Sequence, residues 1–257
     1  MTMRTVSSLV AALVLAACLP KNGLEQAPAA SDPGGPGLST PFPAAPPEPP
    51  VDDDASPGAL PGEPAAPTVF GPVAHRYFPV EPGTVWTYEG SRNGAHRRDV
   101  VRVLHDTRTV MGVECSALFQ EMYLDGVLVE RTWEWFAGDQ DGNLWKFGEE
   151  SFDFEDGLVV LTEDSWEAGV GGALPWMVLV ADPRPGDVTT NGDEIIQVVS
   201  VSAVARVPAG GFRERLEAVE NPDDEDGKDV IIYAPGVGLV SETGTDGGLE
   251  LVSVGNE

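Results

Sequence analysis

Apolar and polar side chains alternate with a period of two along most of the chain beyond residue 69. Successive side chains of a strand point to opposite faces of a sheet, so this period is typical of half-buried β-strands. No window shows the 3.6-residue period of an amphipathic helix. The pattern predicts strands at 84–91, 97–110, 113–124, 127–137, 144–147 with a short continuation, 158–163, 194–207, 212–219, 230–233, 238–242 and 249–254.

Three dipeptides between these runs are hairpin signals: Asn93-Gly94, Asp125-Gly126 and Asp156-Gly157. Both central residues of a tight hairpin turn need a positive φ, which Asn, Asp and Gly tolerate best. A large sheet twists and tends to curl on itself. We therefore predict an all-β fold, an antiparallel meander of about ten strands curled into a half-open or closed barrel. The less regular stretch 165–187 is expected to pack its tryptophans over an end or edge of the sheet.

The beginning of the chain has the pattern of a secretory signal. Arg4 precedes the apolar run 6–15, which is too short to span a bilayer and ends in small residues before Cys18. The ending Leu-Ala-Ala-Cys resembles the bacterial lipobox. The resemblance implies that residues 1–17 are a lipoprotein signal peptide, that the Cys18 thiol receives a diacylglycerol, and that the new amino terminus is acylated. The alternative is an ordinary signal peptide with an incidental cysteine.

Several acyl chains at Cys18 would make a durable anchor, because each buried CH₂ contributes about 0.8 kcal/mol. Leu19 follows the cysteine, and by resemblance to lipoproteins of bacteria with two membranes this favours the outer membrane. Residues 18–68 hold 14 of the chain's 23 prolines and almost no apolar residue larger than Ala. Such a segment buries too little surface to offset its ordering entropy, so we predict a lipid-anchored disordered tether. Residues 69–257 then form a single β domain.

The domain is strongly acidic. From residue 69 onward there are 35 acidic and 13 basic side chains, a balance of −22, within a chain of net charge −27. This balance argues against nucleic acid as a partner and against electrostatic attraction to anionic lipid. Two interpretations remain open: the charge keeps a tethered domain in solution, or it attracts cations or a basic partner.

Cys115 is the one thiol left if Cys18 is lipidated. Alternation places it on one strand face with Val113, Ala117 and Phe119, and nothing nearby in sequence would activate it as a nucleophile. We expect it to pack as a small hydrophobic residue. No disulfide is expected.

Asp139, Asp141 and Asn143 stand at the first, third and fifth positions of a calcium-loop pattern, and Glu150 stands at the twelfth. The sixth position is Leu144, where that loop needs Gly for its sharp turn. Asp and Asn also enrich turns for backbone reasons alone. The sequence therefore leaves a calcium site open without predicting one, and no other metal or cofactor site is predicted.

Enzyme signatures are absent from the sequence. The three histidines have no metal-ligand spacing, and there is no nucleophile elbow or phosphate-binding loop. Glu130 and Glu134 beside Trp133 and Trp135 suggest a sugar cleft with paired carboxylates. Alternation places the tryptophans on one face and the glutamates on the other, so we expect the tryptophans inside and the glutamates in water.

Four patterns occur in an order that resembles a family of uncharacterised secreted bacterial lipoproteins: PGTVWTYEG at 82–90, DGNLWKFGE at 141–149, WEAG at 166–169 and YAPGVGLV at 233–240. More distantly, the pattern resembles the half-barrel of the periplasmic lipoprotein-carrier superfamily, whose concave face holds lipid chains. Those carriers cover the sheet with helices, which this sequence does not predict. Neither resemblance supplies catalytic residues.

The sequence thus favours a membrane-anchored cell-envelope lipoprotein that is a non-catalytic binding or structural module. Its expected partners are the bilayer, through Cys18, and an apolar ligand or an envelope protein. The alternative hypothesis is an envelope glycan hydrolase or sugar-binding protein. Whether the interior is filled by side chains or left as a cavity discriminates between a ligand carrier and a structural or interaction role.

Overall fold

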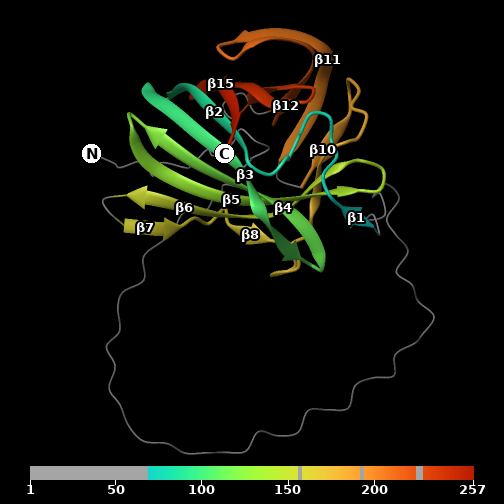
Figure 1. Ribbon diagram of the computed structural model, residues 1–257. Helices are drawn as coiled ribbons and strands as arrows, with labels where there is room; N and C mark the ends of the chain where they lie inside the picture. The colour runs from blue at the N-terminus through green and yellow to red at the C-terminus, as the bar shows by residue number, and fades with distance from the viewer. Residues whose placement is uncertain (1–68, 156–157, 192–193, 224–227) are drawn as a thin grey trace, which may run out of the picture. The chain divides into compact units, whose positions relative to one another are not determined.

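The computed structural model describes residues 69–155, 158–191, 194–223 and 228–257 (Figure 1). The predicted signal peptide, Cys18, the predicted tether and the Asp156-Gly157 turn lie outside these ranges. Within them, no helix is long and apolar enough to cross a membrane. The described strands are β1 (Phe70–Gly71), β2 (Thr84–Arg92), β3 (Ala95–Val110), β4 (Val113–Leu124), β5 (Val127–Asp139), β6 (Leu144–Glu155), β7 (Leu158–Leu161), β8 (Trp166–Glu167), β9 (Trp176–Leu179), β10 (Val188–Thr190), β11 (Ile195–Val207), β12 (Gly210–Glu220), β13 (Asp229–Ala234), β14 (Gly238–Gly244) and β15 (Gly247–Asn256).

The strands form one large antiparallel sheet, which confirms the predicted all-β class. Its order is β10-β11-β12-β13-β14-β15-β2-β3-β4-β5-β6-β7, with β1 added to β5 and with β8 and β9 added to β6. The meander is interrupted only where the C-terminal strand β15 pairs with β2, so that the first and last long strands lie side by side. The order begins at β10 and ends at β7, and among the described strands these two do not pair with each other. The prediction of a closed barrel is therefore wrong, and the sheet is open.

The hairpin signals act as predicted where they are described. Asn93 and Gly94 have φ of 50° and 84° between β2 and β3, and Asp125 and Gly126 have φ of 49° and 81° between β4 and β5. These positive values are those of the tight hairpin turn that such dipeptides favour. The strand β4 has the predicted bounds, whereas the predicted strand 144–147 and its short continuation form one uninterrupted strand, β6, that ends at Glu155.

The stretch 165–187 contributes two short strands instead of irregular chain alone. β8 pairs with the middle of β6 and β9 pairs with its beginning, while β7 pairs with its end. One long strand therefore has β5 along one side and three short strands along the other. Trp166 and Trp176 lie in these short strands at the margin of the sheet, in agreement with the expected place of the aromatic residues.

Two buried apolar clusters lie on opposite faces of β4–β6. We call the face that carries the larger cluster the inner face; it includes Leu118, Phe136 and Leu144 together with residues of β2, β3, β9 and β11–β15. We call the opposite face the outer face; its cluster includes Cys115 and Trp135. Because neighbouring residues of one strand belong to different clusters, both faces of the central strands are covered.

Candidate functional site

The inner face of β5 carries Glu130, Thr132 and Glu134 at alternate positions, and each is only 1% exposed. The sequence-based expectation that both glutamates point to water is therefore wrong. Trp135 lies in the outer-face cluster, and Trp133 is half-buried on that same face. The prediction failed because it assumed that one face of β5 meets solvent, whereas both faces are covered.

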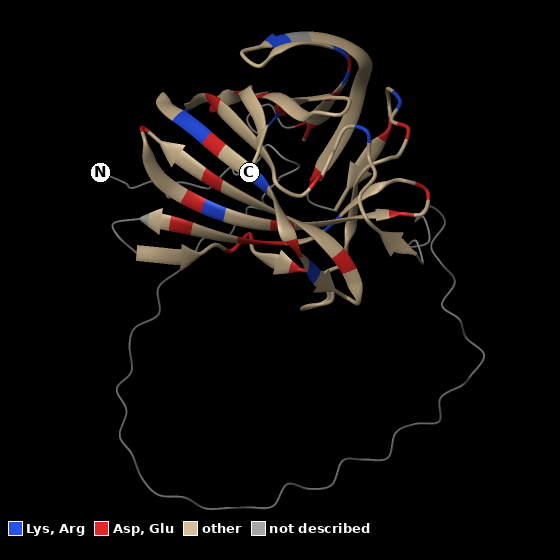
Figure 2. Cartoon of the chain, viewed as in Figure 1, with Lys and Arg blue, Asp and Glu red and all other residues tan. Residues whose placement is uncertain are grey.

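Other charged side chains of the sheet are buried as well as these glutamates. Figure 2 shows acidic and basic positions along the strands themselves and not only in the loops. A buried charge is tolerated when it is paired and hydrogen-bonded, so the partners of each group decide its state. The other buried charged residues are Arg92, Arg97, Asp99, Lys146, Glu149, Glu194, Arg215, Glu220, Asp229 and Glu242.

Arg97 on β3 lies between a carboxylate of its own strand and one of β14. Two residues apart on one strand face, Arg97 and Asp99 form a bidentate pair, with Nε–Oδ1 3.0 Å and Nη2–Oδ2 2.7 Å. The Nη1 atom of Arg97 also lies 3.8 Å from Glu242 Oε1 on β14, and Gln120 donates to Asp99 Oδ2 at 2.9 Å. Burial alone would lower the pKa of Arg97, but Asp99 and Glu242 raise it above its ordinary value. Arg97 is therefore a permanent cation inside the fold.

Lys146 on β6 is the second buried cation. Its Nζ lies 2.8 Å from Glu149 Oε2 and 3.0 Å from Glu134 Oε1. Residues three apart on a regular strand point to opposite faces, but a bulge opposite Trp135 shifts the register of β6. Only glycine fits at position 148 of this bulge, because a Cβ there would lie 2.5 Å from the Trp166 carbonyl oxygen.

One ammonium thus serves two carboxylates. Burial raises the pKa of Glu134 to about 7; Lys146 opposes this and Glu149 adds to it. Burial lowers the pKa of Lys146, but the attraction of Glu149 and Glu134 outweighs it and raises that pKa above the usual value. Lys146 is therefore held as a cation between two carboxyl groups, of which Glu134 titrates near neutral pH.

Three further inner-face carboxyl groups each keep an oxygen without a hydrogen-bond partner in the described structure: Glu130 Oε2, Glu220 Oε1 and Glu242 Oε2. Burial raises the pKa of Glu130 to about 7, although Thr132 donates to its other oxygen at 2.8 Å. Burial raises the pKa of Glu242 to about 8 against the attraction of Arg97, and it raises the pKa of Glu220 well above the usual range. Glu130 and Glu242 are therefore protonated at least in part at neutral pH, and burial favours the neutral form of Glu220 as well.

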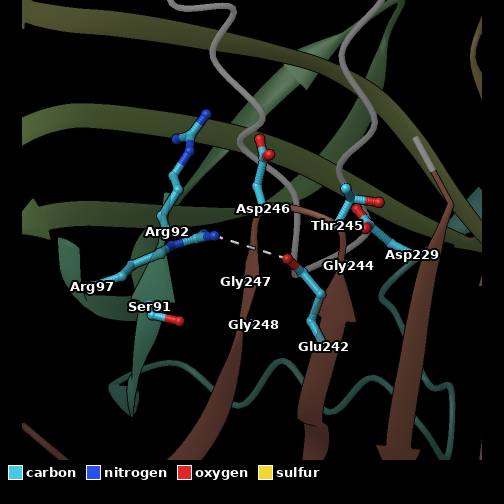
Figure 3. A pocket seen from close by; sticks show the side chains of 10 residues that line it. All are labelled: Ser91, Arg92, Arg97, Asp229, Glu242, Gly244, Thr245, Asp246, Gly247 and Gly248. Atoms are coloured by element: carbon cyan, nitrogen blue, oxygen red, sulfur yellow. Dashed lines mark ion pairs between the residues drawn. The ribbon is translucent and has the colours of Figure 1, made fainter. Parts of the chain in front are cut away.

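A small cleft opens onto this charged interior (Figure 3). Arg92 and Arg97 lie on one side of it, and Glu242, Asp229 and Asp246 face them, with the Arg97–Glu242 ion pair between. Glycines of β14 and β15 line the rest. At Gly244 a Cβ would lie 1.7 Å from Asp229 Oδ1, so only glycine leaves room for that carboxylate.

The cleft has a volume of about 50 Å³. A second cavity, beside Trp86 and Leu239, has about 10 Å³. Ligand pockets for drug-sized molecules measure roughly 300–1,000 Å³, whereas about 10–15 Å³ is enough for one water molecule. These cavities have room for a few water molecules and not for a sugar ring or an acyl chain.

The Asp139 loop is organised by its own hydrogen bonds. Asp139 Oδ1 accepts the backbone N–H groups of Asp141 and Asn143 at 2.9 Å, and Oδ2 accepts Asn143 Nδ2 at 2.8 Å and Trp145 Nε1 at 2.9 Å. Partial burial raises the pKa of Asp139, but these donors outweigh it and lower that pKa below its ordinary value. Asn143 Oδ1 accepts the N–H of Ala181 at 2.8 Å. The Asp139 and Asn143 side chains therefore stabilise a turn. In the described ranges, no cluster of three or more His, Cys, Asp or Glu is arranged to hold a metal ion.

Cys115 is fully buried in the outer-face cluster, as expected. Burial raises the pKa of its thiol to about 12, so the thiolate that a nucleophile needs does not form at neutral pH. Cys18, the predicted lipidation site, lies outside the described residues.

Sequence reasoning missed Arg97, Lys146 and the buried state of Glu134. One signal was present: Arg97 and Asp99 share strand parity with Val101, a clearly apolar position. A charged pair of opposite sign that continues an apolar face indicates a buried ion pair. The bulge at Gly148, which brings Lys146 to the inner face, has no comparable signal.

No family model matches this chain, and neither the curated proteins nor the solved structures searched contain a match.

Proposed function

We propose that this protein is a lipid-anchored lipoprotein of the cell envelope whose β domain is a non-catalytic module that binds another envelope protein. The anchor is the acylated Cys18, and the segment 18–68 is the tether that separates the domain from the membrane. In a source with two membranes, the outer membrane is the favoured location. The partner is a protein and not a small apolar ligand.

The observation that carries this proposal is the small size of the two cavities found among the described residues. A carrier of acyl chains needs an apolar cavity of ligand size, and an enzyme needs a cleft that admits its substrate. The cavity beside Trp86 and the cleft beside Arg97 measure about 10 and 50 Å³. Recognition on the outside of the sheet is then the remaining way for the domain to bind a partner.

We also infer that the open sheet is the half-open barrel expected from its size. Residues Ile196 and Leu216 of the β11–β12 hairpin share the large buried cluster with Phe136 and Val178 of β5 and β9. Strands far apart in the sheet order therefore contribute to one core, which a flat sheet would not allow. The side chains of these strands fill the concavity.

A glycan hydrolase is the second candidate, and one observation favours it. Glu130 and Glu242 have pKa values raised to about 7 and about 8, as a general acid would. Against it, Trp133 and Trp135 lie on the face opposite to Glu130, so the two features that suggested a sugar cleft do not line one cleft.

Intact-mass spectrometry of the full chain from its native host, in mild detergent, tests the proposal. The expected mass is that of residues 18–257 with acyl groups, and no further small molecule is retained under native conditions. Cys18→Ser should remove the acyl mass and release the chain from membranes. A retained lipid or glycan, or an unmodified Cys18, would contradict the proposal. Turnover of cell-wall glycan that is lost in Glu130→Gln or Glu242→Gln would establish the hydrolase instead.

A further inference from the structure

The last strand of the sheet order, β7, exposes four consecutive apolar residues. Leu158, Val159, Val160 and Leu161 are 66%, 59%, 50% and 54% exposed. β7 pairs with β6 along one side and ends the order on the other (Figure 1). The unpaired N–H and C=O groups of an edge strand are a template for pairing with another chain, and exposed apolar side chains beside them favour such pairing.

The orientation of the backbone of β7 follows from its pairing with β6. The N–H of Thr162 donates to the Ser151 carbonyl at 2.9 Å, so residues of even number turn their backbone groups toward β6. Val159 and Leu161, which alternate with them, point their N–H and C=O groups outward. An added strand would find two donors and two acceptors in ladder spacing.

A half-buried aromatic stripe leads across the outer face to this edge. The ring of Phe119 lies 4.6 Å from that of Trp133, and Trp133 lies 6.0 Å from Phe152 in an edge-to-face arrangement. Phe152 stands opposite Leu161, and the next outer-face aromatic residue, Phe154, stands opposite Val159. Apolar side chains on a strand added beyond β7 would extend this stripe by one row.

The charged residues around β7 favour one kind of partner chain over another. Asp153 stands opposite Val160, and Glu163 and Asp164 follow the strand after Thr162. Burial raises the pKa of Asp164 to about 6, and the charges of Glu149, Asp153 and Glu163 raise it further than Lys146 lowers it. These acidic groups already repel one another, and a basic side chain brought beside them would relieve that repulsion.

A second copy of the chain fits this edge poorly. It would bring its own Glu163 and Asp164 to the same edge, and each chain has a net charge of −27. Like charges that face each other across strands are destabilising. Acidic residues beside an apolar strand thus act against self-association while they favour a partner of opposite charge.

We propose that β7 is a docking site for an extended segment of a partner protein, apolar in its centre and flanked by Lys or Arg, which adds to the sheet as a further strand. This inference rests on the proposed function, since it names the surface and the chemistry of the partner. Main-chain hydrogen bonds to Val159 and Leu161 give affinity, the aromatic stripe accepts alternate side chains, and Glu163 and Asp164 select the basic flanks.

Binding of labelled peptides to the full chain in detergent, measured by fluorescence anisotropy at low and high salt, tests the proposal. The probe has a four-residue Val/Ile centre with two Lys at each end; the comparison peptide has Glu in place of Lys. We expect the Lys peptide to bind at least tenfold more tightly than the Glu peptide, with a difference that shrinks in high salt. Equal binding of both peptides, or no binding of either, would overturn the proposal.

Val159→Pro provides the decisive variant, because it removes an outward N–H while leaving the groups that face β6 intact, and edge strands tolerate proline at such positions. It should weaken the Lys peptide at least tenfold. Val204→Lys changes another exposed valine, on β11, and should leave binding unchanged; circular dichroism checks that both variants fold. Unchanged binding in Val159→Pro would locate the site elsewhere, and a dimer in sedimentation that Val159→Pro abolishes would assign the edge to a second copy. Either result would overturn the proposed docking site and leave the proposed function standing. The proposed function itself would be overturned by a ligand found by native mass spectrometry.

Discussion

The inner face of β5 and the strand β7 reverse the usual distribution of residue types within one sheet. Glu130 and Glu134 are almost completely buried, whereas Leu158 and Leu161 are more than half exposed. The difference follows from position in the sheet. β5 has strands on both sides and covered faces, whereas β7 pairs with β6 alone among the described strands and its four side chains are at least half exposed. In these two strands, the position of the strand in the sheet determines which side chains are buried more than the residue type does.

The two regions also carry different kinds of energetic cost. Burying Glu134 costs desolvation, which Lys146 offsets in part and which protonation offsets further. Exposing β7 forgoes the burial of four apolar side chains, each of which would contribute roughly 1.5–3 kcal/mol if fully buried. The cost of burying Glu134 is offset inside the chain, whereas the cost of exposing β7 would be offset only by the partner segment proposed above.

Removal of the buried ammonium is the change expected to break the interior most severely. Lys146→Met leaves Glu134 and Glu149 facing each other without a cation, and breaking a buried pair in this way typically costs about 3–5 kcal/mol. Urea unfolding of the full chain should register that loss. The triple variant with Glu134→Gln and Glu149→Gln should recover most of it, since no uncompensated charge remains. A loss below about 1 kcal/mol in Lys146→Met would mean that the pair does not matter for stability.

The raised pKa values of the inner carboxyl groups predict a pH dependence opposite to ordinary acid denaturation. Glu130 titrates near 7 and Glu242 near 8 in the folded state, against about 4.5 in their unperturbed state. The folded state therefore binds more protons than the unfolded state between about pH 4.5 and 8, and stability falls as the pH rises through that window. At about 1.4 kcal/mol per pKa unit, the rise from pH 5.5 to 8 removes roughly 2 kcal/mol of stability through Glu130 and roughly 3 kcal/mol through Glu242. Unfolding at pH 5.5 and 8 measures this difference.

Glu130→Gln supplies the control for that pH dependence, because glutamine resembles the protonated carboxyl and cannot ionise. The variant should lose part of the difference in stability between pH 5.5 and 8. An unchanged difference would assign the pH dependence to other groups.

The smallest effect is expected at the edge. Val160→Thr on β7 should change stability by no more than about 0.5 kcal/mol, because the side chain is half exposed. The same substitution at Val178 on β9, which is fully buried, should cost about 1–3 kcal/mol because it buries a hydroxyl. Thermal unfolding of the two variants compares them directly. Equal losses would mean that β7 is covered in solution, and the contrast between the two regions would fail.

The strand boundaries were predictable because they depend on local chemistry. Asn93-Gly94 and Asp125-Gly126 set positive φ values at two hairpins whatever the rest of the chain does. The face of β5 was not predictable in the same way. Alternation separates Glu134 from Trp135, but it does not say which face is covered when the chain covers both.

Bulges explain much of the remaining difference between expectation and structure. In β11 strict alternation would place Ile196 and Val198 on the face opposite to Val207, but register shifts follow Val198 and Ser200, and all three residues are buried. The bulge at Gly148 likewise brings Lys146 and Glu149 to one side. A bulge depends on the partner strand, so one strand's pattern alone does not reveal it.

If the proposed tether pulls on the domain, the short strand β1 is the first element of the sheet that the force reaches. Tension that enters from the N-terminal side meets Phe70 first, whose ring packs edge-on against Trp145 at 5.7 Å and Phe147 at 5.0 Å, and whose strand pairs with β5 over two residues. β2, in contrast, is held along its length between β15 and β3. The two-residue pairing of β1 should therefore separate at a lower force than the long pairings of β2. β1 is thus a weakly held strand at the N-terminal side of the described domain.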